Sequence, residues 1–227
     1  DLKHVAELCQ THAALFHTDA VQGVGHYEIN LSEIPIDFLS AAAHKFHGPK
    51  GVGFSFVRTN SGLNPFILGG AQERGLRAGT ESVHNIVGMA KALEISYAKL
   101  DVERNYILDL KAYAKAGLKS LFPDAHFNGC CGDEDKSTYT LLNVCFPVPA
   151  DKAGLLDFHL DLKGIACSKG SACQSGSAAG SHVLNEVVPS HLKSNPSLRF
   201  SFSSFNTRAE IDYLMEILKE FSVTVAS

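Results

Sequence analysis

Lys45 stands at the end of an apolar run, where its amine is placed to do chemistry. Residues 36–43 are mostly apolar and predict a buried strand, which runs into His44 and Lys45 before Gly48-Pro49 breaks the chain. Burial beside a strand end disfavours a charged ammonium and favours a nucleophilic amine. Such an amine can form a Schiff base with a carbonyl cofactor, for which pyridoxal 5'-phosphate (PLP) is the natural candidate. A lone lysine at a strand end is more often an ordinary surface residue. The interpretation therefore depends on three further clusters.

The first of these clusters is the segment F-H-T-D-A-V-Q at residues 16–22. Asp19 is expected at the carboxyl end of a parallel strand, where ligands meet such sheets. Its carboxylate, paired with a pyridine nitrogen, would keep that nitrogen protonated, and Gln22 could hydrogen-bond the ring hydroxyl. Alone, an Asp in this position is more often a turn residue at the end of a strand. It gains weight because Lys45 is expected further along the same sheet.

The second cluster surrounds Cys173 in the segment S-K-G-S-A-C-Q-S-G-S-A-A-G-S at residues 168–181. Small residues and glycines on both sides of one thiol predict a mobile loop rather than a packed core position. A thiol in such a loop suits a nucleophile that must reach one site and then another. A free cysteine in a flexible linker is the alternative. Cys167 resembles a small buried hydrophobic residue and is assigned no chemistry.

The third cluster is Arg199, within the alternating stretch S-L-R-F-S-F at residues 197–202. If its side chain faces inward, the guanidinium can hold a carboxylate through two parallel hydrogen bonds. If it faces outward, Arg199 is an ordinary strand arginine. The sequence alone leaves both alternatives open.

The composition limits the classes of function. The chain has 227 residues, of which 45% are hydrophobic and 19% charged, as in soluble globular proteins of one or two domains. A net charge of -4 gives no basic surface, so nucleic acid is an unexpected partner. No apolar stretch reaches the length of a membrane span, and no signal peptide opens the chain. The six cysteines lack zinc-type spacing, so no metal site is expected. Free thiols at this density favour a reducing, cytoplasmic setting.

The first part of the chain predicts the beginning of an α/β fold. We expect a helix over residues 1–12 and strands over 13–17, 36–43 and 51–57. Strands that alternate with helices favour a largely parallel sheet covered on both faces. Three strands make a narrow sheet of that kind, and the chain begins on a helix without an initiating Met. We therefore expect the later part of a longer protein, with the front of its first domain absent.

From residue 80 onward the pattern becomes helical. Apolar residues recur at helical spacing over 86–97 and again over 110–121, with charged turns between them, and Pro123 ends the second stretch. These stripes are expected to face a core rather than a cofactor.

A second, smaller α/β unit is expected near the carboxyl terminus. Strands are predicted over 141–146 and 198–202, and a helix near 154–162. Thr207 and Glu210 form a capping box that marks the start of the last helix.

Taken together, the motifs resemble the cysteine desulfurases of the NifS/IscS type, within the class V aminotransferase group of PLP enzymes. The resemblance spans nearly the whole chain, in the order and spacing of that family. The resembling motifs are H-T-D-A-V-Q at 17–22, A-H-K-F-H-G-P-K-G-V-G at 43–53, G-G-A-Q-E-R-G-L-R-A-G-T-E at 69–81, S-K-G-S-A-C-Q-S-G-S at 168–177 and S-L-R-F-S at 197–201.

This resemblance implies an α/β protein with the PLP-dependent transferase fold of type I, mostly parallel in its sheet and incomplete here, plus a smaller C-terminal α/β domain. It implies that residues 1–90 are the C-terminal part of the PLP-binding large domain. Residues 91–227 would then comprise an interdomain helix and the small C-terminal domain that carries the mobile cysteine loop.

The resemblance also implies roles for the cofactor-side residues. Lys45 matches the lysine that attaches PLP, and His44 a contact on the phosphate side. Asp19 matches the partner of the pyridine nitrogen, and Gln22 the contact to the ring oxygen. Thr80 matches a threonine that reaches the cofactor phosphate of the neighbouring subunit, which implies a homodimer.

On the substrate side, Arg199 matches the arginine that grips the α-carboxylate of L-cysteine, and Cys173 the cysteine that takes sulfur as a persulfide. The implied reaction converts L-cysteine to L-alanine. The implied partners are a sulfur-acceptor protein or an iron–sulfur scaffold protein.

Two departures from the family pattern bear on this chain. Ala42 stands where the family has a phosphate-binding serine. The ring-stacking histidine, the N-terminal phosphate-binding loop and a second carboxylate contact of the family would lie upstream of residue 1. We therefore expect a desulfurase as the parent enzyme, and weak PLP binding and little or no turnover for this chain alone.

Two alternatives remain. A selenocysteine lyase or a related PLP lyase would share most of these residues, although the thiol at Cys173 favours desulfuration. A non-catalytic interaction module would keep the dimer and acceptor surfaces without the chemistry.

Overall fold

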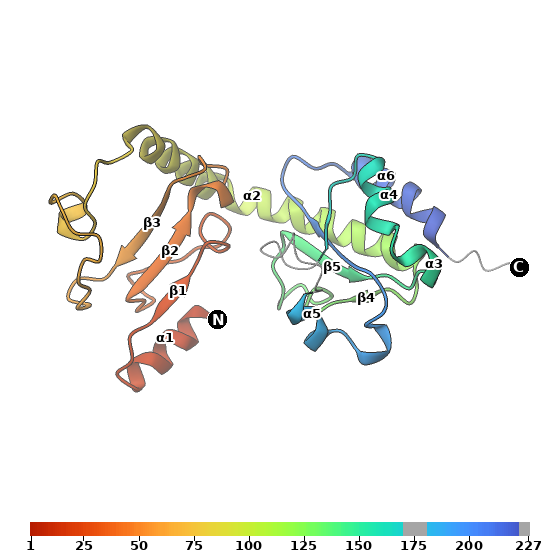
Figure 1. The fold of residues 1–227 in the computed structure, drawn as a ribbon, viewed down its shortest axis with the longest axis horizontal. Coiled ribbons are helices and arrows are strands. Elements are labelled where there is room, and N and C mark those ends of the chain that lie inside the picture. Colours follow the sequence, from red (N-terminus) through yellow and green to blue (C-terminus); the bar gives the residue numbers. More distant parts are fainter. Residues whose placement is uncertain (170–180, 223–227) are drawn as a thin grey trace, which may run out of the picture. The chain divides into compact units, whose positions relative to one another are not determined.

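The computed structural model describes residues 1–169 and 181–222 of the chain, which form two compact units. The first unit is Asp1–Asp101 and the second is Val102–Ser227. Helix α2 (Val83–Leu121) contributes its first part to one unit and its second part to the other (Figure 1). The functional roles assigned to residues 1–90 and 91–227 remain predictions.

The first unit is built on a three-stranded sheet of order β1-β2-β3, with β1 at His17–Asp19, β2 at Phe38–Ala42 and β3 at Gly53–Val57 (Figure 1). Helix α1 (Leu2–Thr11) precedes the sheet and is N-capped by Asp1, whose carboxylate accepts a hydrogen bond from the backbone N–H of His4 at 3.0 Å. The fully or nearly fully buried core residues are Ala6, Ile36, Leu39, Ala43 and Phe46. Helix and sheet therefore share one apolar interior.

The α/β class predicted from the sequence is confirmed, and the pairing of the strands is now explicit. β1 runs parallel to β2, whereas β3 runs antiparallel to β2. A parallel crossover needs about a dozen residues or more. Residues 43–52, which join β2 to β3, are too few for one and include the short 3-10 helix η1 (Ala43–Lys45). The chain therefore turns back on itself.

The sequence analysis gave the wrong bounds for one strand and for one helix. The strand expected over 13–17 begins only at His17, because Ala13 adopts a positive φ of 50° at the end of α1. The charged turns expected between 86–97 and 110–121 are instead part of the single helix α2. The intervening residues 98–109 contain no Gly or Pro, so nothing in the backbone interrupts the helix.

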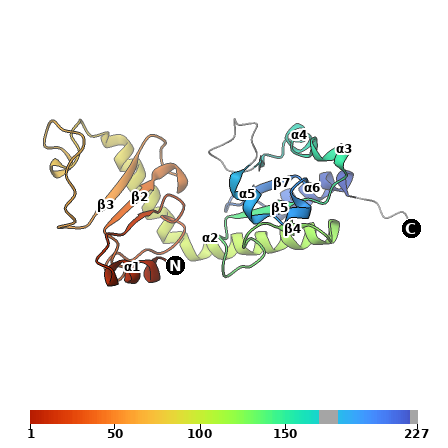
Figure 2. The same cartoon turned by 60° about the horizontal axis from the view of Figure 1, so that its bottom comes forward.

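The second unit holds a four-stranded antiparallel sheet of order β4-β5-β7-β6. The strands are β4 (His126–Phe127), β5 (Leu141–Cys145), β6 (Ser168–Lys169) and β7 (Ser197–Ser201). β5 and β7 pair over five residues and lie side by side at its centre (Figure 2). The strands predicted over 141–146 and 198–202 are thus confirmed, while the two-residue strands β4 and β6 escaped the sequence analysis.

Short helices surround this sheet: α3 (Ala150–Ala153), α4 (Leu156–Leu162), α5 (His182–Val187), α6 (Arg208–Leu218) and the 3-10 helices η4 (Ser190–Leu192) and η5 (Lys219–Phe221). Leu118 of α2, Leu160 of α4 and Leu218 of α6 are buried in the same core. Phe146 packs edge-on against Phe122 and Phe200, with ring centroids 5.4 and 6.2 Å apart. This core holds most of the buried apolar residues of the unit, and a second, smaller cluster of Leu110, Ala114 and Ile211 joins α2 to α6.

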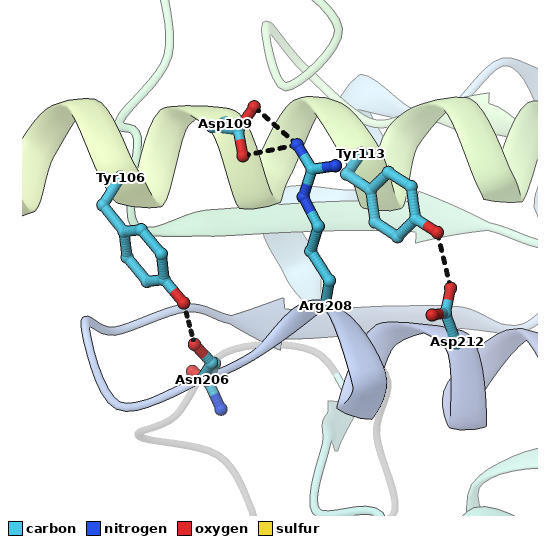
Figure 3. Close-up of polar contacts among 6 residues, drawn as sticks. All are labelled: Tyr106, Asp109, Tyr113, Asn206, Arg208 and Asp212. Atoms are coloured by element: carbon cyan, nitrogen blue, oxygen red, sulfur yellow. Dashed lines mark hydrogen bonds and ion pairs between the residues drawn. The ribbon is translucent and has the colours of Figure 1, made fainter.

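Polar side chains join α2 to α6 on the surface of the second unit (Figure 3). The Arg208 guanidinium donates to both carboxylate oxygens of Asp109, at 3.0 and 2.8 Å, and its Cζ lies 4.8 Å from the centroid of the Tyr113 ring. The Tyr113 hydroxyl donates to Asp212 at 2.6 Å, and this hydrogen bond raises the pKa of Tyr113. Because these groups are exposed to solvent, we expect each contact to contribute little to the free energy of unfolding. Their role is to connect α2 with α6 at defined positions.

Helix α6 begins with the capping box predicted from the sequence, which is confirmed. The Thr207 hydroxyl accepts from the backbone N–H of Glu210, and the Glu210 carboxylate accepts from the backbone N–H of Thr207. The Tyr106 hydroxyl donates to the carbonyl of Asn206, directly before the cap, at 2.7 Å (Figure 3). The start of α6 is therefore fixed by its own capping box and by the hydrogen bond from Tyr106 of α2.

Across the residues that the structure describes, no helix has the length and apolar character needed to cross a membrane.

We expect Thr207→Ala to lower the free energy of unfolding by about 1 kcal/mol, because the helix loses a capping acceptor. Thr207→Ser keeps the hydroxyl and should stay close to wild type. Urea unfolding followed by circular dichroism measures both variants. Equal stability of Thr207→Ala and Thr207→Ser would contradict this role of the cap.

A matched pair of glycines separates backbone strain from side-chain overlap in the first unit. Gly25 and Gly51 share a φ of 81°, but a Cβ on Gly25 would lie 2.5 Å from the Cβ of Phe46, whereas one on Gly51 would meet nothing within 4 Å. Gly51→Ala should therefore cost about 1 kcal/mol from the left-handed backbone alone. Gly25→Ala should cost about 1–3 kcal/mol more from overpacking. Thermal unfolding of the two variants tests the difference.

Candidate functional site

The parallel pairing of β1 and β2 brings their carboxyl ends to one edge of the sheet. In this register Asp19, the last residue of β1, is opposite Ser40 in β2. The pairing continues past the strand, because the N–H of Ala20 donates to the carbonyl of Ser40 at 2.9 Å. The chain leaves β2 through η1, which contains His44 and Lys45. The segments that follow the two strands thus start from the same edge, where ligands meet parallel sheets.

Lys45 is half-buried, and its backbone is fixed on both sides. Its carbonyl accepts a hydrogen bond from Nε2 of His26, at 2.9 Å, which assigns the proton of that ring to Nε2. The next residue, Phe46, is buried in the core, and its N–H donates to the carbonyl of Ala43 at 3.1 Å. Among the described residues, the amine of Lys45 has no hydrogen-bond or ion-pair partner. A positioned amine without a partner is available to a ligand.

The other cofactor-side candidates are exposed. One carboxylate oxygen of Asp19 accepts from the backbone N–H of Val21 at 3.0 Å, which closes an Asx turn. Asp19 therefore lies in a turn, as the alternative interpretation held, while its second oxygen accepts no hydrogen bond from the described residues. Gln22 and His44 are also exposed.

Thr80 lies in the same unit, ahead of α2, and is exposed. It follows Gly79, whose φ of 121° suits glycine rather than residues with a side chain. Within the described part of the chain, the Thr80 hydroxyl makes no hydrogen bond to Asp19 or Lys45. Its predicted contact to a neighbouring subunit remains a prediction.

Arg199 belongs to the second unit, at the middle of β7. It is opposite Asn143 of β5 and Ser168 of β6. Its Nη2 donates to the Ser168 hydroxyl at the long distance of 3.5 Å, and its Nε is buried without a hydrogen-bond partner among the described residues. A buried guanidinium donor without a partner is uncommon in native proteins. This arrangement fits an acceptor such as a carboxylate arriving with a ligand.

Cys173 lies outside the described residues, so its predicted role is not addressed by the geometry. Cys167 is half-buried, and burial raises the pKa of its thiol. This agrees with the absence of any chemical role for Cys167 in the sequence analysis.

The groups at the sheet edge fit a cofactor of the PLP kind. A carbonyl group needs an amine, a protonated pyridine needs a carboxylate, and a phosphate needs donors. Lys45, Asp19 and His44 supply these three kinds of group at or beside the ends of β1 and β2. Ala42 has no side-chain hydrogen-bond donor. Of the three groups of the cofactor, the phosphate is therefore the one for which these residues supply the fewest contacts.

The sequence analysis did not identify two histidines whose side chains form hydrogen bonds to residues near the ends of β1 and β2. His26 holds the carbonyl of Lys45, and Nε2 of His17 lies 3.0 Å from the hydroxyl of Ser40 across β1 and β2. Both contacts join residues far apart in sequence. Only the position of His17 at the start of the H-T-D-A-V-Q motif offered a signal.

Comparisons with known proteins place these residues in a family. The model of the class-V aminotransferases matches residues 1–214. The cysteine desulfurase IscS of Clostridium botulinum is 39% identical over 96% of this chain and 54% of that protein. The mitochondrial cysteine desulfurase of Candida albicans is 37% identical over 96% of this chain and 44% of that protein.

Solved structures give the same picture. A NifS-like protein superposes with a TM-score of 0.81 at 32% identity, over 96% of this chain and 56% of that one. A NifS-like protein from Rickettsia africae superposes with the same TM-score at 26% identity. The chain spans about half the length of the curated relatives it matches. With its motifs in the family's order and its fold shared with these structures, the chain belongs to the aminotransferase class-V family.

Proposed function

We propose that this chain supplies the cofactor-attaching and sulfur-accepting residues of a PLP-dependent cysteine desulfurase. The observation that carries the proposal is that β1 ends at Asp19 and β2 leads into η1, which contains Lys45, at the same carboxyl end of this parallel pair. The names of the relatives, cysteine desulfurases in bacteria and in a mitochondrion, support the same reaction. The substrate is L-cysteine, and the products are L-alanine and a persulfide on the enzyme.

On the cofactor side, Lys45 would hold the cofactor through its amine and would carry protons to and from the substrate carbon. Asp19 keeps the pyridine nitrogen protonated through its open carboxylate oxygen. Gln22 would donate to the ring oxygen, and His44 would contribute a donor to the phosphate. When bound, PLP supplies an electron sink for the carbanion that forms at the substrate.

On the substrate side, Arg199 binds the α-carboxylate of L-cysteine, and its unpartnered Nε supports this role. The Cys173 thiolate attacks the sulfur of the substrate. The carbon–sulfur bond breaks, a sulfur–sulfur bond forms on Cys173, and the carbon skeleton leaves as alanine after protonation. The persulfide sulfur then passes to an acceptor protein, such as an iron–sulfur scaffold.

The assembly is proposed to be a cytoplasmic homodimer in which Thr80 reaches the phosphate of the neighbouring subunit. The exposed position of Thr80 at the start of α2 supports a contact outside its own chain. The cysteines among the described residues are free, which suits a reducing compartment.

The isolated chain is proposed to bind PLP weakly. Its relatives are about twice as long, and the phosphate side lacks a hydroxyl at Ala42. This chain would therefore supply more contacts to the pyridine ring of PLP, from Asp19 and Gln22, than to its phosphate.

We expect PLP to attach preferentially to Lys45. After incubation with excess PLP and reduction with borohydride, peptide mass spectrometry should find the pyridoxyl group on Lys45 about tenfold more often than on Lys50, a preference worth about 1.4 kcal/mol. Lys50 is the matched control, because it is exposed and only five residues away. Equal labelling of both lysines would contradict the assignment of Lys45.

We also expect no distinct visible absorption band when the chain and PLP are mixed in equal amounts at micromolar concentration. The reason is the small set of phosphate contacts that these residues supply. A stable band under these conditions that disappears in Lys45→Ala would show that the isolated chain binds the cofactor tightly, against the proposal.

The role of Cys173 is testable in a single turnover with L-cysteine and excess PLP. Mass spectrometry should find one added sulfur on Cys173. When a thiol reductant is then added to cleave the persulfide, the wild-type chain should release sulfide and Cys173→Ser should release none. Cys167→Ser should behave as wild type, because burial raises the pKa of the Cys167 thiol and keeps it protonated at neutral pH. Sulfide release that survives in Cys173→Ser would favour a lyase without a thiol nucleophile.

The same thiol distinguishes an enzyme from an interaction module. Alkylation of Cys173 should stop sulfur release while binding of an acceptor protein persists. If the unmodified chain binds the acceptor but never forms a persulfide, even with excess PLP, the interaction module is the better description.

A further inference from the structure

Two adjacent thiols lie in the second unit, apart from the residues assigned to desulfuration. Cys130 and Cys131 occupy the segment G-C-C-G at residues 129–132, between β4 and β5. Both are free cysteines. Cys130 is exposed, while Cys131 is half-buried and packs against the core of the unit. One thiol is therefore open to solvent, and its neighbour is anchored.

The backbone that carries these thiols is held in place. The N–H of Cys131 donates to the carbonyl of Asn128 at 3.3 Å, and the N–H of Asp133 donates to the carbonyl of Cys130 at 2.9 Å. From α2, the Lys115 ammonium donates to the carbonyl of Gly132 at 2.6 Å. The two thiols thus sit on a tight turn tied to the long helix, and not on a free loop.

A buried cation lies beside this turn. Lys111 of α2 is only 2% exposed, and its ammonium donates to the Ser137 hydroxyl and the Thr138 carbonyl, both at 2.8 Å. Within the described part of the chain, it forms no ion pair with a carboxylate. Burial lowers the pKa of Lys111. A buried ammonium without a carboxylate partner leaves room for an anionic group nearby.

A disulfide between Cys130 and Cys131 would be strained. The Cα atoms of adjacent residues are about 3.8 Å apart across a trans peptide. Disulfides join Cα atoms that are roughly 4.4–6.8 Å apart, and shorter separations strain the bond. A metal ion that bridges two thiolates needs no sulfur–sulfur bond and escapes this limit.

The ligand set selects the kind of ion. Thiolates favour soft ions such as Cu(I) over hard ones. Zinc sites use four ligands, or three with an open position. No group of three or more His, Cys, Asp or Glu side chains that could hold a metal ion exists among the described residues. Two thiolates therefore suit a soft ion of low coordination number.

We propose that Cys130 and Cys131 form a two-thiolate site for one soft, low-coordinate metal ion of the Cu(I) type. Both thiols lose a proton, and the ion keeps its charge of +1, so no oxidant or reductant is needed. The two thiolates and the ion together carry a net charge of -1, which the Lys111 ammonium compensates. The site is independent of the proposed desulfurase activity.

The test is a titration of the full, reduced chain with Cu(I) under anaerobic conditions, in competition with the chelator bicinchoninate. All variants are made in a Cys173→Ser background, so that this thiol does not contribute. One equivalent of Cu(I) should bind, with a thiolate-to-copper absorption band in the near ultraviolet. Cys130→Ser and Cys131→Ser should each weaken binding by about 100-fold or more, because a single thiolate cannot chelate the ion.

Controls separate the site from general thiol affinity. Cys9→Ser and Cys167→Ser remove half-buried thiols elsewhere and should leave the titration unchanged. Lys111→Met should weaken binding about tenfold, as the loss of a group outside the ligand shell does in metal sites. If Lys111→Met fails to fold, the exposed Cys130 still provides a variant that leaves the core intact.

Two results would overturn the proposal. One is unchanged Cu(I) affinity in both Cys130→Ser and Cys131→Ser. The other is a disulfide between the two cysteines that forms in preference to copper binding. Trypsin would release both cysteines in one peptide, residues 120–136, whose mass falls by two hydrogens if they are joined.

Discussion

The parallel pairing of β1 with β2 is the constraint on which the cofactor side of this protein depends. It places Asp19 opposite Ser40, and it starts the two following segments from the same edge of the sheet. Side chains alternate between the faces of a sheet, so a slip of one residue would turn every side chain of β1 to the opposite face. In the site that we propose, Asp19 would then point away from the ring that Lys45 holds. The proposed site therefore depends on the register of β1 against β2 as well as on the presence of Lys45.

Contacts beyond the strands protect this register. The guanidinium of Arg58, just after β3, donates to the carbonyls of Leu31, Ile34 and Ile36 in the connection between β1 and β2. His26, in the same connection, binds the carbonyl of Lys45. The connection is therefore fixed at the entry to β2 and again beyond its end, where η1 carries the lysine. These bonds give the residues around Lys45 a scaffold of their own, within the first unit.

The sequence predicted much of the fold because its signals were local. The capping box of Thr207 and Glu210, the alternating strand around Arg199 and the apolar run before Lys45 all depend on neighbours within a few residues. The signals failed where the outcome depends on distant partners or on single backbone angles. Ala13 ends helix α1 with a positive φ, and the two-residue strands β4 and β6 exist only because β5 and β7 pair with them. The contact of His26 with Lys45 likewise has no local signature.

The sequence also named candidate site residues, and their roles stay predictions. Motif order named Asp19, Lys45 and Arg199. In the structure, Asp19 closes a turn, Lys45 is half-buried, and Nε of Arg199 is buried with no hydrogen-bond partner among the described residues. The buried Lys111 and the turn of Cys130 and Cys131 carried no motif. Lys111 stands out only through its burial and because it forms no ion pair with a carboxylate among the described residues, and neither is visible in the sequence.

The central claim is that Asp19 and Lys45 serve the same ring. The most direct measurement is the ¹⁵N NMR shift of the ring nitrogen, recorded as a function of pH on ¹⁵N-labelled pyridoxyl groups reduced onto Lys45. The account predicts that this nitrogen stays protonated to higher pH in the wild-type chain than in Asp19→Asn, where the carboxylate is replaced by a neutral amide. Identical titration of the ring nitrogen in the two proteins would mean that Asp19 does not touch the ring, and would contradict the account.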